Sequence, residues 1–369
     1  KVTGKQGRTS LGAMLAADDA PGDFSTEERA DPGRSSEIAR LAGHKAHVGV
    51  LRLERDIGHE SSVGLIGTAY SFVDKHNYLG GFDGRFRLGP QTVAALQLVG
   101  TAWRGPFFDP DLGQDVYRTG NGLGYYVNLE QSGRHFNLTF NGEGVSPEYR
   151  TEVGYTRRYD TNRETLWLRY NSEPKPDASV VSWSLRNKSY ADFDWRGRLQ
   201  LTEHYPQVQF NFRSQSFLIL YAFFGYERLF EEEFGARRTP TRSGAFSGAP
   251  ERGSGYKGLE LEAGTTPGQK FSCRVDTWYV WGIFDLDRGG GRRFPRVSPA
   301  ALRDPDAPLD PGPGNQWYLN GSVTYQPTKG LRTSIEYLKG RLVRQDTRRV
   351  AFDSNLFALR ATYQFTPFI

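Results

Sequence analysis

Strict alternation of apolar and polar residues is the feature that most constrains what this chain can fold into. In residues 314–327, every second residue from Trp317 to Tyr325 is apolar or small, and the residues between them are polar. Successive side chains of a β-strand point to opposite faces, so this segment has one apolar face and one polar face. In a soluble sandwich the apolar face is buried. In a membrane-spanning β-barrel it meets lipid, and the polar face lines the lumen.

The same alternation recurs along the whole chain and predicts an antiparallel, all-β protein. Residues 122–142 have the pattern of a hairpin with its turn at Ser132 and Gly133, and residues 192–201 have that of a single strand. Counting such segments gives about 17 or 18 strands, most of them about 9 to 11 residues long. That length is enough for a tilted strand to cross a bilayer.

The connections between the predicted strands fall into two groups. A helical turn is expected within 26–43, with Asp31 as the N-cap before Pro32. Short turns at one end and long loops at the other are typical of outer-membrane barrels. No shift in composition divides the chain, so residues 1–369 are interpreted as one transmembrane domain. The short connections are 58–60, 131–133 and 328–330, and the long ones are 18–45, 235–254 and 286–315.

Strand number and the charged polar face favour the membrane barrel. Some 17 consecutive long strands would leave a soluble sheet with exposed edges, whereas closure removes them. The predicted fold is therefore an antiparallel outer-membrane β-barrel of about 16–20 strands. The residues expected to line the lumen are Arg85, Arg87, Arg196, Arg198, Arg274, Arg332, Arg360, Asp83, Asp276, Glu260, Glu262 and Glu336. Those expected to face lipid are Trp317, Leu319, Val323, Leu138 and Phe140.

Composition is consistent with this interpretation and argues against other classes of protein. The mean hydropathy is -0.60 with 14% aromatic residues, and no run of about 18 apolar residues could form a transmembrane helix. A net charge of +5 dispersed along the strands gives no support for nucleic-acid binding. Cys273 is the only cysteine, which excludes an internal disulfide, and its alternating flanks indicate a packed residue.

Four segments resemble a large, functionally uncharacterised bacterial envelope family. They are KVTGKQGRTSLGAM, VLRLERDIGHESSVGLIGTAY, HNYLGGFDGRFRLGP and YRTEVGYTRRYD. Members of that family join an N-terminal domain similar to family 9 carbohydrate-binding modules to a long C-terminal region that looks like an outer-membrane barrel. The resemblance covers nearly all of this chain within the barrel region, and implies a location in the bacterial outer membrane. The chain also starts at Lys1 without an apolar signal segment, and the family pattern continues past Phe365. We therefore expect a portion of a longer precursor.

Motifs for cofactors and metals are weak. Residues 253–258 match the dinucleotide fingerprint G-x-G-x-x-G, but no helix is expected after them, so a flexible turn is the preferred interpretation. The aspartates of DPDLGQD and RDPDAPLDP are interpreted as solvated acidic loops, with surface calcium as the alternative. The six histidines lack any metal-ligand spacing. No cofactor is therefore expected.

A catalytic function is not predicted. His59 and Ser61 lie two residues apart but in a predicted turn, and no third residue would orient them. The Glu260 and Glu262 pair is explained by an inward row of carboxylates that arginines neutralise. Two functions remain open. The first is passage or binding of polar or anionic solutes or glycans. The alternative is a non-conducting barrel that anchors a glycan-binding domain or joins other envelope proteins in an assembly complex.

Overall fold

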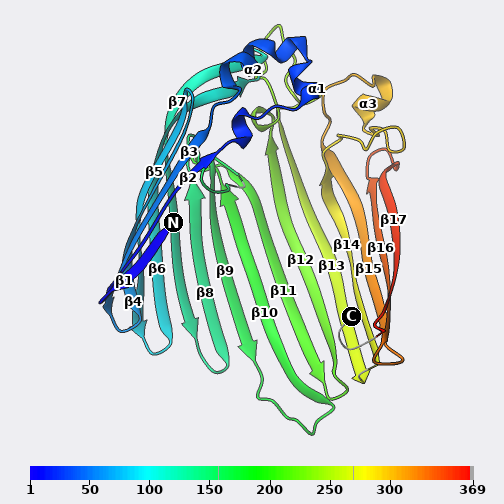
Figure 1. Ribbon diagram of the computed structural model, residues 1–369. Coiled ribbons are helices and arrows are strands. Elements are labelled where there is room, and N and C mark those ends of the chain that lie inside the picture. The colour runs from blue at the N-terminus through cyan, green and yellow to red at the C-terminus, as the bar shows by residue number, and fades with distance from the viewer. Residues whose placement is uncertain (157, 269, 366–369) are drawn as a thin grey trace. The chain divides into compact units, whose positions relative to one another are not determined.

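The computed structural model describes residues 1–156, 158–268 and 270–365, and strands dominate it (Figure 1). Seventeen strands belong to one sheet, which confirms the all-β prediction. By its contacts the chain divides into two compact units. Unit 1 comprises residues 1–132, 139–165 and 192–198, and unit 2 comprises residues 133–138, 166–191 and 199–369. In the described residues, no helix combines the length and the apolar character needed to cross a membrane.

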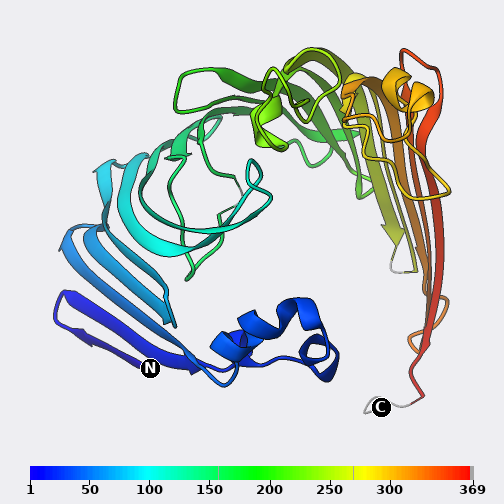
Figure 2. The ribbon, with the colours of Figure 1, turned by 90° about the horizontal axis from the view of Figure 1, so that it is seen from above.

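Unit 1 begins the chain and is built from long antiparallel strands. They are β1 (Val2–Gln6), β2 (Thr9–Asp18), β3 (Ala46–Gly58), β4 (Ser61–Phe72), β5 (Lys75–Gly89), β6 (Thr92–Asp109) and β7 (Gln114–Ser132). The connection between β2 and β3 carries η1 (Ala20–Gly22), α1 (Thr26–Arg29), η2 (Pro32–Arg34) and α2 (Ser35–Leu41). These helices gather at one end of their strands (Figure 2). The predicted helical turn is confirmed, because the Asp31 side chain accepts a hydrogen bond from the Gly33 amide as an N-cap.

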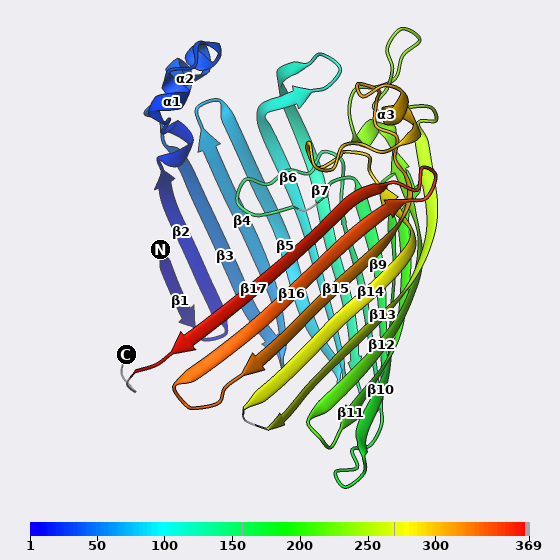
Figure 3. The same ribbon diagram turned by 90° about the vertical axis from the view of Figure 1, so that its right-hand side faces the viewer.

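Unit 2 continues the same up-and-down order. Its strands are β11 (Leu199–Phe212), β12 (Ser216–Phe230), β13 (Glu251–Gly268), β14 (Phe271–Asp285), β15 (Gly312–Tyr325), β16 (Leu331–Arg344) and β17 (Val350–Tyr363). The strands β8 (Phe136–Val145), β9 (Thr161–Asn171) and β10 (Val180–Phe193) contribute residues to both units. The loops of unit 2 carry η3 (Glu231–Glu233) and α3 (Pro299–Arg303). Figure 3 shows β13 to β17 running side by side as tilted strands.

Loop lengths alternate along the chain as predicted. In unit 2 the connections 231–250 and 286–311 are long, and they alternate with the short turns 213–215 and 326–330. Because the strands run antiparallel, the two long connections lie at one end of this unit and the short turns at the other. We call the first the loop end. The prediction of short turns opposite long loops is therefore confirmed within this unit.

Two local predictions were wrong. Residues 253–258 are not a flexible turn but lie inside β13, where they pair with β12, and Lys257 and Gly258 pair with β14 as well. Residues 192–201 are not one strand, because β10 ends at Phe193 and β11 begins at Leu199, with a turn between them. In both cases alternation and glycine content were misleading, since pairing with neighbouring strands decides where a strand ends.

The two faces of unit 2 show whether the apolar side chains of the strands form a buried core or an exposed surface. Leu261 pairs with Leu220 on one side and Thr277 on the other, and the neighbouring pairs Tyr279–Trp317 and Val323–Ile335 lie on the same face. The large side chains of this face are exposed by more than a third, including Leu220, Leu259, Leu261, Tyr279, Trp317, Val323 and Ile335. An exposed apolar face of this size belongs in lipid. We call it the apolar face and the opposite one the polar face.

Unit 1 repeats the arrangement. A row of paired residues crosses five strands with exposed side chains and consists of Leu11, Leu53, Leu65, Phe82 and Leu98. The neighbouring row on the other face holds Glu54, Gly64, Asp83 and Gln97. A one-residue change of register would exchange these two rows, so the ladder specifies which face is apolar.

Aromatic side chains border the apolar face of unit 2. Tyr226 and Trp281 are exposed near the loop end, and Phe271, Tyr325 and Tyr363 are exposed near the opposite end. Outer-membrane barrels have such girdles where their strands leave the hydrocarbon region. The indole nitrogen of Trp317 donates to Thr277 Oγ1 at 3.2 Å, so this polar group is satisfied on the apolar face.

The two faces predict different responses to arginine. Leu261→Arg, between the two girdles, should destabilise the protein by about 2–4 kcal/mol because lipid cannot solvate the charge. Asn320→Arg should be close to neutral, since Asn320 pairs with Asp276 on the polar face. Urea-induced unfolding in lipid vesicles measures both free energies. An equal cost at the two positions would contradict the assignment of the faces.

Candidate functional site: the polar face and its loops

Ion pairs organise the polar face of unit 1. The Arg52 guanidinium on β3 hydrogen-bonds both carboxylate oxygens of Asp83 on β5 and also contacts Glu54 Oε2 at 3.2 Å. Gly64 on β4 lies between these strands, and a Cβ there would be 2.6 Å from Arg52 Nη2. The glycine therefore lets the arginine cross β4. Asp83 is thus on the polar face as predicted, and Arg52 is its partner.

A loop covers part of this polar face. Of the connection between β8 and β9, residues 146–152 lie against β5, β6 and β7. The buried Asn77 side chain donates to the Arg150 carbonyl at 2.9 Å and accepts from the Glu152 amide at 3.3 Å. The Trp103 indole donates to the Glu148 carbonyl at 2.7 Å. We call residues 146–160 the covering loop, and its backbone is anchored by side chains of the wall itself.

Arg150 is a residue of the covering loop whose own side chain also holds the loop against the wall. Its guanidinium lies over the rings of Trp103, Phe107 and Tyr159, at 5.6, 5.3 and 4.1 Å from their centroids. It also donates to the Tyr149 carbonyl at 2.6 Å. Cation–π contacts of this kind stabilise by about 0.5–2 kcal/mol each, depending on desolvation. Sequence alternation could not reveal this loop, because it detects strands and not the residues that pack on them.

Carboxylates are concentrated on the polar face of unit 2. Glu262 pairs directly with Asp276 across β13 and β14, and Arg274 donates to Glu262. Like charges directly opposite each other destabilise a sheet unless a cation compensates them. One oxygen of Asp276 is buried without a hydrogen-bond partner among the described residues. The structure therefore brings together Glu260, Glu262, Arg274 and Asp276, which the sequence placed on the polar parity of their strands without showing that they are neighbours.

Tyrosines form a second polar group that the sequence did not indicate. The Tyr190 hydroxyl donates to Glu203, which is 5% exposed. Tyr205 stacks on Tyr190 at 6.4 Å between ring centroids and contacts Phe223 at 5.6 Å. Reading tyrosine as an apolar residue concealed this group, because its ring packs like phenylalanine while its hydroxyl binds a carboxylate.

Other predicted residues lie on the polar face or near its ends. Arg85 donates to the Glu60 carbonyl at 2.9 Å, and Arg87 forms an ion pair with Glu60 at 3.0 Å, so both reach the short turn between β3 and β4. Arg332, Glu336 and Arg360 share the polar parity of β16 and β17. The five residues expected to face lipid all point to the apolar face of their strands. They are Trp317, Leu319, Val323, Leu138 and Phe140.

The strand positions of Arg196 and Arg198 were predicted wrongly. Both lie in the turn 194–198, where Gly197 has a φ of 80°. Asp194 accepts from the backbone amides of both arginines and from Arg198 Nε at 2.6 Å. Burial would raise the pKa of Asp194, but these hydrogen bonds outweigh it and lower the pKa below its ordinary value. The turn chemistry ends the strand because the carboxylate satisfies its amides.

A compact group of loops lies at the loop end of unit 2. We call residues 231–250 and 286–311 the loop cap, since Phe246 and Leu309 form a parallel bridge between them. Asp287 is 1% exposed and accepts from Arg296 Nη2 at 2.8 Å and from the Asp310 amide at 3.0 Å. A buried carboxylate needs such partners to remain ionised. The sequence indicated these loops only by their Pro, Gly and charged residues.

Arg344 joins the loop cap to the wall. It is 1% exposed, contacts Asp285 at 3.2 Å and Asp346 at 3.0 Å, and donates to the Asp310 carbonyl at 2.6 Å. Replacing one partner of such a buried network typically costs about 3–5 kcal/mol. The loop cap is thus a structured part of the protein and not a solvated tether.

Glu231 is the second anchor of the loop cap. Its carboxylate accepts from Arg238 Nη2 at 2.9 Å, from Arg238 Nε at 3.1 Å and from the Phe246 amide at 2.7 Å. The Arg238 hydrogen bonds lower the pKa of Glu231 below its ordinary value of 4.5, although burial opposes them. The carboxylate therefore stays ionised in mildly acidic solution.

The prediction of solvated acidic loops agrees with the exposure of Asp111, Asp304 and Asp306 but was wrong for Asp310, whose carboxylate is bound by Arg252 and is mostly covered. Asp109 accepts from the Asp111 amide at 2.9 Å and from Arg118, and Asp304 accepts from the Asp306 amide at 3.0 Å. Throughout the described residues, no three His, Cys, Asp or Glu side chains gather in a geometry that could hold a metal ion. Asp115, the remaining aspartate of the first loop, is the second residue of β7 and pairs with Phe108.

Comparison with known proteins identifies the fold. No protein-family model matches the sequence, and no curated protein matches it. Among solved structures, the copper transporter OprC matches with a TM-score of 0.52 at 11% identity, covering 97% of this chain and 62% of that one. OccK1 (OpdK) of Pseudomonas aeruginosa matches with a TM-score of 0.38 at 10% identity, covering 96% of both chains. The chain thus spans less than two thirds of OprC.

The fold is therefore that of outer-membrane β-barrels. The exposed apolar face, its aromatic girdles and the opposed loop lengths all agree with this class. Proteins of this fold span the outer membranes of bacteria. The solved structures that it resembles include ones named as a copper transporter, OprC, and as a siderophore receptor, PirA.

The stability of the loop cap should depend on pH, because the pKa of Glu231 is lowered. A carboxylate whose folded-state pKa is depressed contributes stability that is complete above about pH 4.5 and is lost as the pH falls through the folded-state pKa. Hydrogen exchange of residues 235–250, corrected for the intrinsic rate, should therefore accelerate at about pH 3 relative to pH 6. In Glu231→Gln it should be fast at both values.

Glu232→Gln is the matched control, because Glu232 is an exposed neighbour in the same helical turn. It should retain the protection and the pH dependence of the unmodified protein. Equal exchange in Glu231→Gln and Glu232→Gln would contradict the anchoring role of Glu231.

Proposed function

We propose that this protein is a non-catalytic outer-membrane barrel that passes small polar solutes, including anionic solutes and glycans. The observation that carries the proposal is the contrast between the faces, one exposed and apolar and the other rich in ionised groups. Polar faces of this kind need water or opposite charges to satisfy them, which a hydrated lumen supplies. The relatives in fold whose names refer to transport support the same function.

A weak charge preference is part of the proposal. The abundance of arginine suggested an anion-selective lumen, but Arg52, Arg163 and Arg274 each form an ion pair with a carboxylate. Paired charges contribute little net field at a distance. Arg332 and Arg360 are exposed on the polar face and add positive charge. We therefore propose only a small preference for anions.

The alternative is a non-conducting barrel that anchors a glycan-binding domain or serves as a subunit of an envelope assembly complex. The covering loop favours it, because Asn77, Trp103 and Arg150 fix that loop against the polar face. The resemblance to the envelope family with a carbohydrate-binding front domain motivates the anchoring role. In that case the lumen would be occluded.

Conductance in planar lipid bilayers separates the two functions. A solute-passing barrel should insert with uniform current steps, and its reversal potential in a potassium chloride gradient should show a weak preference for chloride. Complete absence of current from correctly folded, heat-modifiable protein would overturn the proposal and favour the structural alternative.

The covering loop gives a sharper test. Asn77→Ala removes the two hydrogen bonds from this side chain to the loop backbone at residues 150 and 152, so the loop should loosen there and the conductance and current noise should rise. Asn121→Ala is the control, because Asn121 is exposed and pairs with Ala102 on the other face. It should conduct like the unmodified protein. Identical currents from both variants would show that the loop does not restrict the path.

A further inference from the structure

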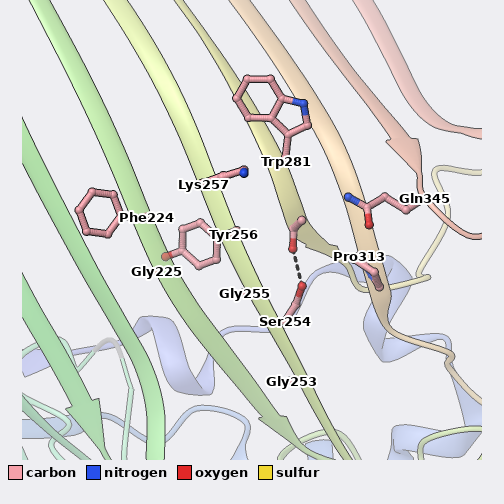
Figure 4. Close-up of a pocket in the computed structure, with 11 residues that line it drawn as sticks. Phe224, Gly225, Gly253, Ser254, Gly255, Tyr256, Lys257, Trp281, Pro313 and Gln345 are labelled. Carbon is pink, nitrogen blue, oxygen red and sulfur yellow. Dashed lines mark hydrogen bonds between the residues drawn. The ribbon is translucent and has the colours of Figure 1, made fainter.

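A pocket of about 520 Å³ opens near the loop end of β12, β13 and β14 (Figure 4). Phe224, Lys257 and Trp281 project around it, and Pro313 and Gln345 complete its rim. Phe224 and Trp281 both pair with Lys257, so all three lie on one face of the sheet. That face is the apolar face, because Leu259 follows Lys257 two residues along β13.

A glycine creates the recess. Gly253 and Gly255 are successive residues on the apolar parity of β13, but a Cβ at Gly253 would clash with the Tyr226 hydroxyl, so Gly255 is the one of the two that leaves open space. A Cβ at Gly255 would have its nearest neighbour, the Gly225 carbonyl oxygen, at 3.9 Å, which is ordinary contact. The glycine is therefore not required by backbone packing. The G-x-G-x-x-G motif thus forms the floor of a pocket within a strand.

The backbone next to the recess is distorted in a defined way. The register between β14 and β15 shifts between Trp281 and Ile283, and Gly282 has a φ of 85°. Ser254 Oγ donates to the Gly282 carbonyl at 2.6 Å and is buried. This bulge places Trp281 at the edge of the recess, since bulges redirect neighbouring side chains.

Lys257 is the charged group of the pocket. Its ammonium forms no ion pair with any residue that the structure describes, and the side chain is exposed. Glu251, the acidic residue on the same strand face, is bound by Arg228. An unpaired cation between two aromatic rings at the edge of an apolar surface attracts an anionic group, and it does so more strongly there than in bulk water.

An apolar groove continues from the pocket. It has a volume of about 590 Å³ and is lined by Leu220, Leu259, Leu261, Tyr279 and Trp317. Lys257 and Leu259 alternate along β13, and Trp281 and Tyr279 alternate along β14, so the groove follows the pocket toward the centre of the apolar face. An anionic head site with an apolar groove beneath it matches one kind of molecule, an amphiphile.

We propose that the pocket and groove bind one anionic lipid of the outer leaflet. Its phosphate lies at Lys257 between Phe224 and Trp281, and an acyl chain lies in the groove below. The loop end is the extracellular end in proteins of this fold, which sets the leaflet. The proposal depends on the apolar face meeting lipid and not on solute passage, so a protein that does not conduct can still bind this lipid.

Native mass spectrometry of the detergent-purified protein tests the proposal. Phosphatidylglycerol and phosphatidylcholine with the same acyl chains serve as anionic and neutral probes. The unmodified protein should bind one phosphatidylglycerol at least about fivefold more tightly than phosphatidylcholine, as expected for one lysine near a lipid phosphate. Lys257→Gln should remove that preference. Gly255→Val should weaken the binding of both lipids by filling the recess.

Two matched variants serve as controls. Gly321→Val adds the same side chain on the apolar parity of β15, where no atom lies within 4 Å of the new Cβ. Lys329→Gln removes a charge in the exposed turn at the opposite end. Both should bind lipid like the unmodified protein. Equal affinity for the two lipids, or equal losses in Lys329→Gln and Lys257→Gln, would overturn the proposal. Complete competition by inorganic phosphate would also overturn it, because the site would then bind a free anion.

Discussion

Lipid offers no hydrogen bonds to a peptide backbone, and this constraint shapes every other feature of the chain. A strand can cross a bilayer only if neighbouring strands satisfy its amides and carbonyls. The long antiparallel ladders, such as β5–β6 and β12–β13, do this for their whole length. Once the backbone is satisfied in this way, side chains alone decide which face meets lipid. The apolar rows of both units follow from that condition.

Charged side chains lie where an opposite charge or a hydrogen-bonding group is within reach. On the polar face of unit 1, Asp83 is balanced by Arg52, and the intervening Gly64 makes their contact possible. Where the loop cap meets the wall, Asp287 of the cap and Arg344 of β16 are almost fully buried and have several partners each. Glycines therefore serve two purposes in this protein, since Gly64 admits an arginine and Gly255 leaves a recess.

Much of the fold was predictable because period-two alternation is a local property. The apolar parity of Trp317 and Val323 and the polar parity of Glu262 and Asp276 were predicted correctly from sequence. Turn chemistry was harder. Arg198 looked like a strand residue, but Asp194 binds its amide and side chain and ends β10. The sequence places these two residues four apart without showing that they form a turn.

The sequence by itself determined the all-β class, the two-faced strands and the opposition of short turns and long loops, because each of these depends on residues that are near neighbours in the chain. Only the tertiary structure decided that Asn77 holds residues 150 and 152, that Arg344 reaches Asp310, and that Lys257 stands over a recess beside Trp281. These contacts join residues that are distant in sequence or on different strands. Their distances are set by strand register and loop packing, which hydrogen bonds between strands fix and local alternation does not.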